Sequence, residues 1–314
     1  MISLEVFKKF LNVFCFKELL RTPDSELRTG ILTRRLFLRG LIGLPLLSSL
    51  SFPLREGEAA STSFTIGDGK NSIANFFLGE ELVYEVGVWL FKRVALGKLS
   101  FKEAGEKGRY VAILQAETLG VLGWVARYRV DTYRSTMEEV EGGRRLRSIS
   151  FEEDVKIGNK VRKKIHLFDY RNRKWVQMRQ RKDGSMERTV QEIPSGMVYD
   201  DFITASYNFR YGVYGEVDRG KKYSVATFPR KKATTYEVII AGKEEEEERR
   251  KRSEKSKEGK EHYVKLFLDP EITHSKEGLI EGWLSKDLYP VEGTIKEVIL
   301  FGDVKGTLIK NTKG

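Results

Sequence analysis

The sequence predicts a mainly β fold, a curved antiparallel sheet of open-barrel or sandwich-like form with one central α-helix. Beyond residue 75, short segments with apolar residues at every second position follow one another closely, as expected for strands with one buried face. Turn-forming pairs such as Gly142-Gly143, Gly158-Asn159 and Asp183-Gly184 separate several of these segments. Aromatic residues make up 11% of the 314 residues, and aromatic side chains favour strands.

The first sixty residues read as a leader with an export signal. Residues 33–39, TRRLFLR, resemble the twin-arginine signal, whose pattern is Ser/Thr-Arg-Arg-x-Phe-Leu-Lys. Residues 40–54 then carry no charge, a length that suits a signal peptide and falls short of the roughly 20 residues of a membrane-spanning helix. Small residues at 57–61 offer a cleavage site. The signal residues are Arg34, Arg35, Phe37 and Leu38. The alternative is a buried amphipathic helix with chance arginines.

The position of this signal bears on the start and the compartment of the protein. Such signals normally lie within a few residues of the start, so we expect residues 1–30 to reflect a misassigned start, with the true one near Ile31 or Leu32. The single cysteine, Cys15, precedes the apolar run, so the mature chain is expected to have no thiol, as suits an oxidising compartment. We expect a periplasmic or extracytoplasmic protein, membrane-associated if the signal is uncleaved, with the twin-arginine translocase as its partner during export.

The mature chain is expected to begin with a linker at 61–75, followed by one β-rich domain at 76–312. In GEELVYEVGVWLFKRV, residues 79–94, apolar side chains including Leu82, Tyr84, Val86 and Val88 recur at every second position. Further strand segments are expected at 108–120, 124–134, 145–155, 160–170, 174–180, 221–228, 234–240, 262–269, 278–287 and 289–309.

Two segments depart from the strand pattern. Residues 197–212 predict one helix of three to four turns, with Asp200 and Asp201 near its N-terminus and Arg210 near its end, charges that complement the helix dipole. Capping by the two aspartates is favoured over a catalytic acid/base pair. Residues 243–261, KEEEEERRKRSEKSKEGKE, have too little apolar surface to order themselves, so we expect a mobile or transiently helical hairpin extension.

Three motifs resemble a bacterial exported family known as domain of unknown function 3108. They are GEELVYEV at 79–86 with Gly97-Lys98-Leu99, YDDFITASYNFR at 199–210, and WLSKD at 283–287 with Pro290-Val291. Their order spans about residues 76–310. The resemblance implies an exported β-rich protein. It implies no catalytic residues, because none are known for the family.

The sequence contains no pattern that specifies a cofactor or a metal. The three histidines, His166, His262 and His274, fall in separate segments without the spacing of a zinc site. Glycine-rich phosphate loops and the G-x-S-x-G elbow are absent from the sequence. The net charge is +11, yet no compact basic patch with interleaved aromatics indicates nucleic-acid binding. We therefore expect no cofactor, no metal and no nucleic-acid partner.

The leading hypothesis is a non-enzymatic cell-envelope protein that binds a lipid, a glycan or a partner protein on a concave sheet face. The candidate binding residues are Tyr84, Trp89, Tyr199, Asp200, Tyr207, Arg210 and Trp283. One alternative is a hydrolase-like enzyme that uses carboxylates near Asp200 and Asp201, or Asp287. Another is a structural assembly factor that uses the charged segment as its contact.

Overall fold

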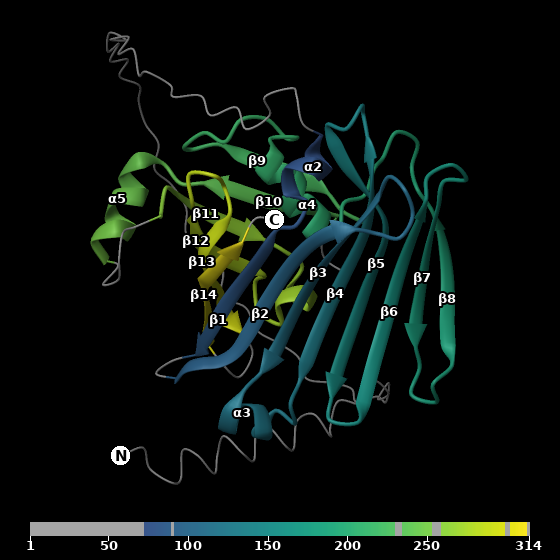
Figure 1. The fold of residues 1–314 in the computed structure, drawn as a ribbon, viewed down its shortest axis with the longest axis horizontal. Helices are drawn as coiled ribbons and strands as arrows, with labels where there is room; N and C mark the ends of the chain where they lie inside the picture. Colours follow the sequence, from purple (N-terminus) through teal and green to yellow (C-terminus); the bar gives the residue numbers. More distant parts are fainter. Residues whose placement is uncertain (1–71, 89–90, 230–233, 253–258, 299–301, 313–314) are drawn as a thin grey trace, which may run out of the picture. The chain divides into compact units, whose positions relative to one another are not determined.

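The computed structural model describes residues 72–88, 91–229, 234–252, 259–298 and 302–312 (Figure 1). The described residues all belong to one unit of the chain, residues 63–314. The export signal and the proposed start and cleavage site lie outside the described residues, as does the candidate binding residue Trp89.

The described residues form one antiparallel sheet of fourteen strands, so the predicted mainly β class is confirmed. The sheet order is β8-β7-β6-β5-β4-β3-β2-β1-β14-β13-β12-β11-β10-β9, in which every neighbour is consecutive in the chain except the pair β1 and β14. The edge strands β8 and β9 do not pair, so the sheet is open. The strands are β1 (Glu81–Val88), β2 (Phe91–Glu103), β3 (Arg109–Thr118), β4 (Val130–Val140), β5 (Arg145–Ile157), β6 (Lys160–Asp169), β7 (Lys174–Gln180), β8 (Met186–Glu192), β9 (Lys222–Ala226), β10 (Thr235–Ile240), β11 (His262–Phe267), β12 (Leu279–Leu284), β13 (Pro290–Val298) and β14 (Gly302–Thr312).

The central predicted helix is α4, the connection between the two edge strands of the sheet. It begins after Asp201, whose side chain caps it, and ends at Gly212, which adopts the left-handed conformation (φ 90°) that glycine accepts without steric cost. It is shorter than predicted, because the aspartates precede the first helical turn instead of lying within it. The helices of the described ranges are α2 (Ile73–Phe77), α3 (Gly120–Val125), α4 (Phe202–Tyr211), α5 (Lys243–Arg252) and α6 (Pro270–Thr273).

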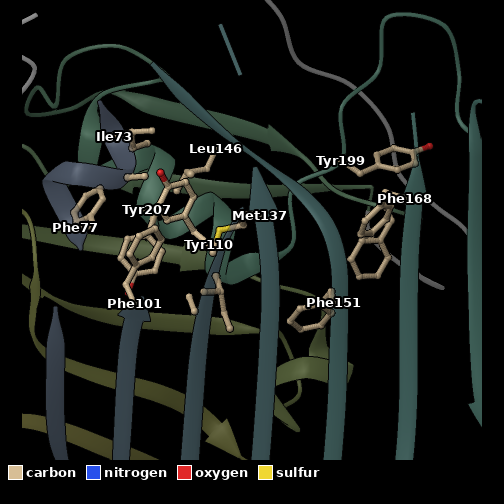
Figure 2. Close-up of a cluster of buried hydrophobic side chains, with 14 of the residues drawn as sticks. Ile73, Phe77, Phe101, Tyr110, Met137, Leu146, Phe151, Phe168, Tyr199 and Tyr207 are labelled. Atoms are coloured by element: carbon tan, nitrogen blue, oxygen red, sulfur yellow. The ribbon is translucent and has the colours of Figure 1, made fainter. Parts of the chain in front are cut away.

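The sheet curls around α4, which packs against both of its halves. We call β1–β8 the N-terminal wing and β9–β14 the C-terminal wing. On one side of α4, Ile203 and Tyr207 join a cluster that includes Phe101 and Phe151 of the N-terminal wing (Figure 2). On the other side, Phe209 packs on strands β9–β12 of the C-terminal wing, and Ala205 does the same one turn earlier. We call the sheet face that contacts α4 the inner face.

Aromatic rings fill most of the cluster in the N-terminal wing. Figure 2 shows Phe77, Phe101, Tyr110 and Tyr207 grouped together, with ring centroids of Phe77 and Phe101 each 4.9 Å from that of Tyr207. Farther along the sheet, Phe228 lies among the rings of β5–β7 and is fully buried. Edge-to-face and tilted ring contacts of this kind add to the free energy gained by burying the rings.

Several predicted boundaries require correction. The strand predicted from residue 79 to 94 is two strands that pair with each other, with Val88 opposite Phe91. The strand expected from residue 124 begins at Val130, because residues 120–125 form the short helix α3 instead. The predicted linker stops before Ile73, because Ile73 and Ala74 lie in α2 and are fully buried. Strand β8 was not predicted, since all seven of its side chains are exposed and carry no apolar alternation.

The charged segment is more ordered than expected over residues 243–252. It forms α5 on the outer face of the C-terminal wing, where Glu246 is buried and accepts a hydrogen bond from Arg219 Nε at 2.8 Å. The guanidinium groups of Arg249 and Arg250 lie over the rings of Tyr263 and Trp283. Ion pairs and cation–π contacts therefore replace the apolar surface that the segment lacks. Residues 253–258 lie outside the described ranges.

Candidate functional site

Three of the candidate residues, Tyr84, Tyr207 and Arg210, lie near the C-terminal end of α4. The Arg210 guanidinium forms a two-pronged ion pair with Glu80, with nitrogen–oxygen distances of 2.7 and 2.5 Å, and both side chains are about 95% buried. The Tyr207 ring is completely buried, and burial followed by the nearby Glu80 carboxylate raises the pKa of its hydroxyl. The Tyr84 hydroxyl donates to the carbonyl of Pro290 on β13 at 3.0 Å. The contacts of this group tie α4 to the centre of the sheet.

The two adjacent aspartates have different roles, and both are fully buried. Asp201 caps α4 by accepting hydrogen bonds from the backbone N–H groups of Ile203 and Thr204 at 2.9 and 3.0 Å. Its second oxygen accepts from the hydroxyls of Ser135 and Thr204. The capping interpretation is thus met at Asp201, and its carboxylate has no contact with solvent.

Asp200 instead anchors the connections around α4. Its Oδ2 accepts hydrogen bonds from Arg145 at 2.8 Å, Tyr214 at 2.5 Å and Asn208 at 3.2 Å. Burial raises the pKa of Asp200 to about 6, although the Arg145 guanidinium opposes the rise. A hydrolase needs an accessible carboxylate beside a cleft. The contacts of Asp200 and Asp201 give that alternative no support.

The remaining candidates lie apart from this group. Tyr199 packs on Phe168 and Trp175 in the aromatic cluster. Trp283 lies on the outer face, where it packs edge-to-face on Tyr263 beneath α5. Asp287 is exposed in the turn between β12 and β13. The structure therefore places Tyr84 close to Tyr207 and Arg210 of α4, with Asp200 just before the helix, and separates Trp283 and Asp287 from them.

Part of the inner face is not covered by α4. Because paired residues share a face, the strand register identifies its side chains: Val86 is opposite Gly306, Gly306 is opposite Gly293, and Val304 is opposite Ile295. All five of these residues are partly exposed, although they lie on strands in the centre of the sheet. Ala116 of β3, also partly exposed, continues this surface through Gly97 of β2. We call Val86, Ala116, Gly293, Ile295, Val304 and Gly306 the inner patch.

A charged group borders the inner patch on the N-terminal wing. Asp131 is directly opposite Ala116, and its carboxylate binds Arg129 Nε at 2.8 Å. On the next strands Glu153 lies opposite Lys164, with an ion pair of 3.7 Å. His274 from the C-terminal wing is exposed to solvent and reaches Arg129 at 3.4 Å. We call Arg129, Asp131, Glu153, Lys164 and His274 the polar border.

His166 extends this border into the core. Its Nδ1 accepts a hydrogen bond from Trp175 Nε1 at 3.3 Å, which leaves the proton on Nε2, 3.6 Å from a Glu153 oxygen. The ring is buried and stacks on Phe228. His166 is therefore a core residue whose Nε2 faces the Glu153 carboxylate.

Outside these groups, the part of the chain that the structure describes contains no second gathering of predicted site residues. No group of three His, Cys, Asp or Glu side chains in these ranges could hold a metal ion. None of the helices described is long and apolar enough to cross a membrane. A hollow lined by Thr235, Glu237, Phe267 and Lys276 lies beside α6 and contains no predicted site residue.

The inner patch and the polar border were not predicted from the sequence. Their glycines and alanine carry no signal of function on their own, and the charged residues alternate with apolar ones as in any half-exposed strand. The available signal was the period-two pattern, which places Val86 on the same face as Leu82 and Tyr84. The neighbours of Val86 on β14, more than 200 positions away, follow only from strand pairing.

The comparisons with known proteins agree with the three motifs. A model for a family described as proteins of unknown function, DUF3108, matches residues 83–309. No curated protein and no solved structure matches the chain. The matched region covers most of the chain and nearly every strand of the sheet, from β1 to β14. The chain therefore belongs to the DUF3108 family of proteins of unknown function.

Proposed function

We propose that this protein is an exported, non-enzymatic protein of the cell envelope that binds an amphiphilic ligand, of the lipid class, on the inner face of its sheet. The observation that carries the proposal is the partly exposed inner patch on central strands. An apolar face in the middle of a large sheet is normally buried, and an exposed apolar surface of this kind is typical of a binding site.

The chemistry of the surrounding residues favours an amphiphile over a glycan. The inner patch offers only aliphatic and backbone surface, whereas sugar rings need many hydrogen-bonding groups. The polar border adds donors from Arg129 and Lys164 and acceptors from Asp131 and Glu153 beside that surface. An apolar chain on the patch with a polar head at the border satisfies both parts.

A lipid-binding role gives a reason for exporting a protein whose sequence carries no catalytic motif. The resemblance of residues 33–39 to a twin-arginine signal supports transport to the extracytoplasmic side of the membrane. There a lipid-binding protein has access to the lipids of the cell envelope. The protein is a membrane-associated one if that signal is retained. A partner protein on the inner face is disfavoured, because the inner patch lies where the two wings join, on the face around which the sheet curls (Figure 1).

The test compares the native and denatured masses of the protein purified gently from its native envelope. We expect a discrete excess mass that solvent extraction identifies as lipid. A protein that stays folded and monomeric without any excess, and that takes up no phospholipid from mixed phosphatidylethanolamine–phosphatidylglycerol vesicles, would contradict the proposal.

A matched pair of variants locates the ligand. A Cβ at Gly306 would meet only the Gly293 carbonyl at 3.9 Å, so Gly306→Leu extends a side chain over the inner patch without backbone strain. We expect this variant to lose at least about tenfold in bound lipid, with the melting temperature little changed. The control is Gly105→Leu in the β2–β3 turn, where a Cβ meets nothing within 4 Å. Equal loss in both variants, or in neither, would place the ligand elsewhere.

A further inference from the structure

At one end of the N-terminal wing, three chain segments carry exposed apolar side chains and basic side chains, and none of the three contains an acidic residue. Three segments meet there: residues 91–93 at the start of β2, residues 119–128 around α3, and residues 156–162 at the β5–β6 turn. Backbone hydrogen bonds join Leu119 to Val94, which directly follows the first segment, and Gly158 to Arg127. Figure 1 shows α3 at the same end of the sheet as the β5–β6 turn. We call these three segments the rim.

The apolar side chains of the rim are unusually exposed. Half of the ten large hydrophobic residues that are exposed in the described part of the chain lie on it, with exposed fractions between 44% and 66%. They are Phe91, Val121, Trp124, Tyr128 and Val161. Tryptophan and tyrosine in such positions are typical of the interface between a membrane and water, because their rings are apolar and their tips are polar.

The charge of the rim is of one sign. Its three segments contain six basic residues and no acidic one, and all six are exposed. They are Lys92, Arg93, Arg127, Lys156, Lys160 and Arg162. On the adjoining strands, Asp131 forms an ion pair with Arg129 and Asp154 forms one with Lys163, and Glu117 lies on β3 two residues before the rim. Basic side chains around apolar ones fit a surface of anionic lipid headgroups.

The turns at the opposite end of the same strands lack both the exposed apolar side chains and the single sign of charge. The turns at 104–108, 141–144 and 170–173 contain the acidic residues Glu106 and Glu141 among basic ones. No exposed large hydrophobic residue lies in them. The rim also holds Arg93, Arg127 and Tyr128 at positive φ, a conformation that costs free energy in non-glycine residues and is often kept for function.

We propose that the rim docks the protein onto a bilayer surface rich in anionic lipids, with Trp124 and its apolar neighbours inserted among the headgroups. This inference depends on the rim alone and stands whether or not the inner patch binds a ligand. The occupant is a lipid surface, because one sign of charge combined with scattered protruding side chains offers no groove for a folded partner.

The test is hydrogen–deuterium exchange of the full chain with and without phosphatidylglycerol vesicles, which reports each segment separately from the leader. We expect slower exchange at the rim, reversed by 0.5 M salt, and unchanged exchange at residues 104–108 and 141–144. Unchanged exchange at the rim would overturn the inference. Slower exchange at higher protein concentration without vesicles, or with a lipid-free fraction of envelope proteins only, would assign the rim to a protein contact instead.

Substitutions on the rim test whether its apolar and its basic side chains each contribute to vesicle binding. The double variant Val121→Ser/Trp124→Ser is expected to weaken vesicle binding by about tenfold or more, since it removes the inserted apolar groups. Its control, Met186→Ser/Val190→Ser, removes two exposed hydrophobic residues of β8 and should leave binding unchanged. Lys156→Gln/Lys160→Gln should weaken binding by about fivefold per charge. Equal effects of the rim variants and the β8 control would contradict the docking surface.

Discussion

Asp200 is a buried carboxylate that accepts hydrogen bonds from three donors, one of which is the Arg145 guanidinium. Burial raises its pKa to about 6, above the 3.8 of an exposed aspartate. Between these two values the folded state binds more protons than the unfolded state, so the free energy of unfolding falls as pH rises. The stabilisation that the protonated form supplies is complete below about pH 4 and lost above about pH 6.

The first prediction follows from this fall in the free energy of unfolding with rising pH. Asp200→Asn should remove the titration, so the variant should gain stability relative to the natural protein by up to about 3 kcal/mol between pH 4 and pH 7. The measurement is urea unfolding of both proteins over that range. The control is Asp287→Asn, the same substitution at an exposed turn residue. A stability difference that is independent of pH would show that Asp200 is already ionised at pH 4.

At the scale of elements, α5 shows how a highly charged helix can be ordered. Its ten residues hold few apolar groups, yet the Glu246 carboxylate is buried between Arg219 and the backbone N–H of Tyr263. Lys265 and Glu281 of the underlying strands complete ion pairs with Glu245 and Arg249. Opposite charges at fixed positions on the sheet therefore determine which face of the helix packs down.

The corresponding prediction is a local one. Glu246→Ala should leave the Arg219 guanidinium without its buried partner and raise the hydrogen-exchange rates of the amides at 243–252 by about tenfold or more. Exchange in β1–β8 should not change. Glu247 is exposed on the same helix, so Glu247→Ala is the matched control. If both variants exchange alike, Glu246 does not hold the helix.

At the scale of the whole molecule, α4 connects the two wings of the sheet. It lies between the edge strands in sequence, packs on both wings and is tied to the entry of β1 by the Glu80–Arg210 ion pair. A buried pair of this kind is costly to break, because the remaining charge has no water around it. Its loss should therefore affect both wings together.

The whole-molecule prediction uses both partners. Arg210→Met should lower the free energy of unfolding by about 3–5 kcal/mol, and exchange should accelerate in β9–β12 as well as in β2–β5. The double variant Glu80→Leu/Arg210→Met should lose much less, since it leaves no unpaired charge. Additive losses in the double variant, or faster exchange in one wing alone, would show that the wings do not depend on this pair.

The sequence by itself determined the class of the fold and the family. The period-two pattern of segments such as 79–88 is local, so it identifies strands without knowledge of their partners, and the three motifs led to a family that the comparisons confirm. The same local logic located α4 and its cap, because a capping aspartate acts on the next three residues. The exposed strand β8 was missed, since no buried face marks its sequence.

Only the tertiary structure decided what the individual residues do. The partner of Arg210 is 130 positions away, and the neighbours of Val86 on β14 are more than 200 positions away, so neither contact leaves a trace in the local sequence. Asp200 and Tyr207, which we expected to be candidate ligand-binding residues, are fully buried and contact other residues of the core. The inner patch and the rim exist because strand pairing gathers small and exposed side chains from distant segments, a non-local effect that residue type and spacing do not encode.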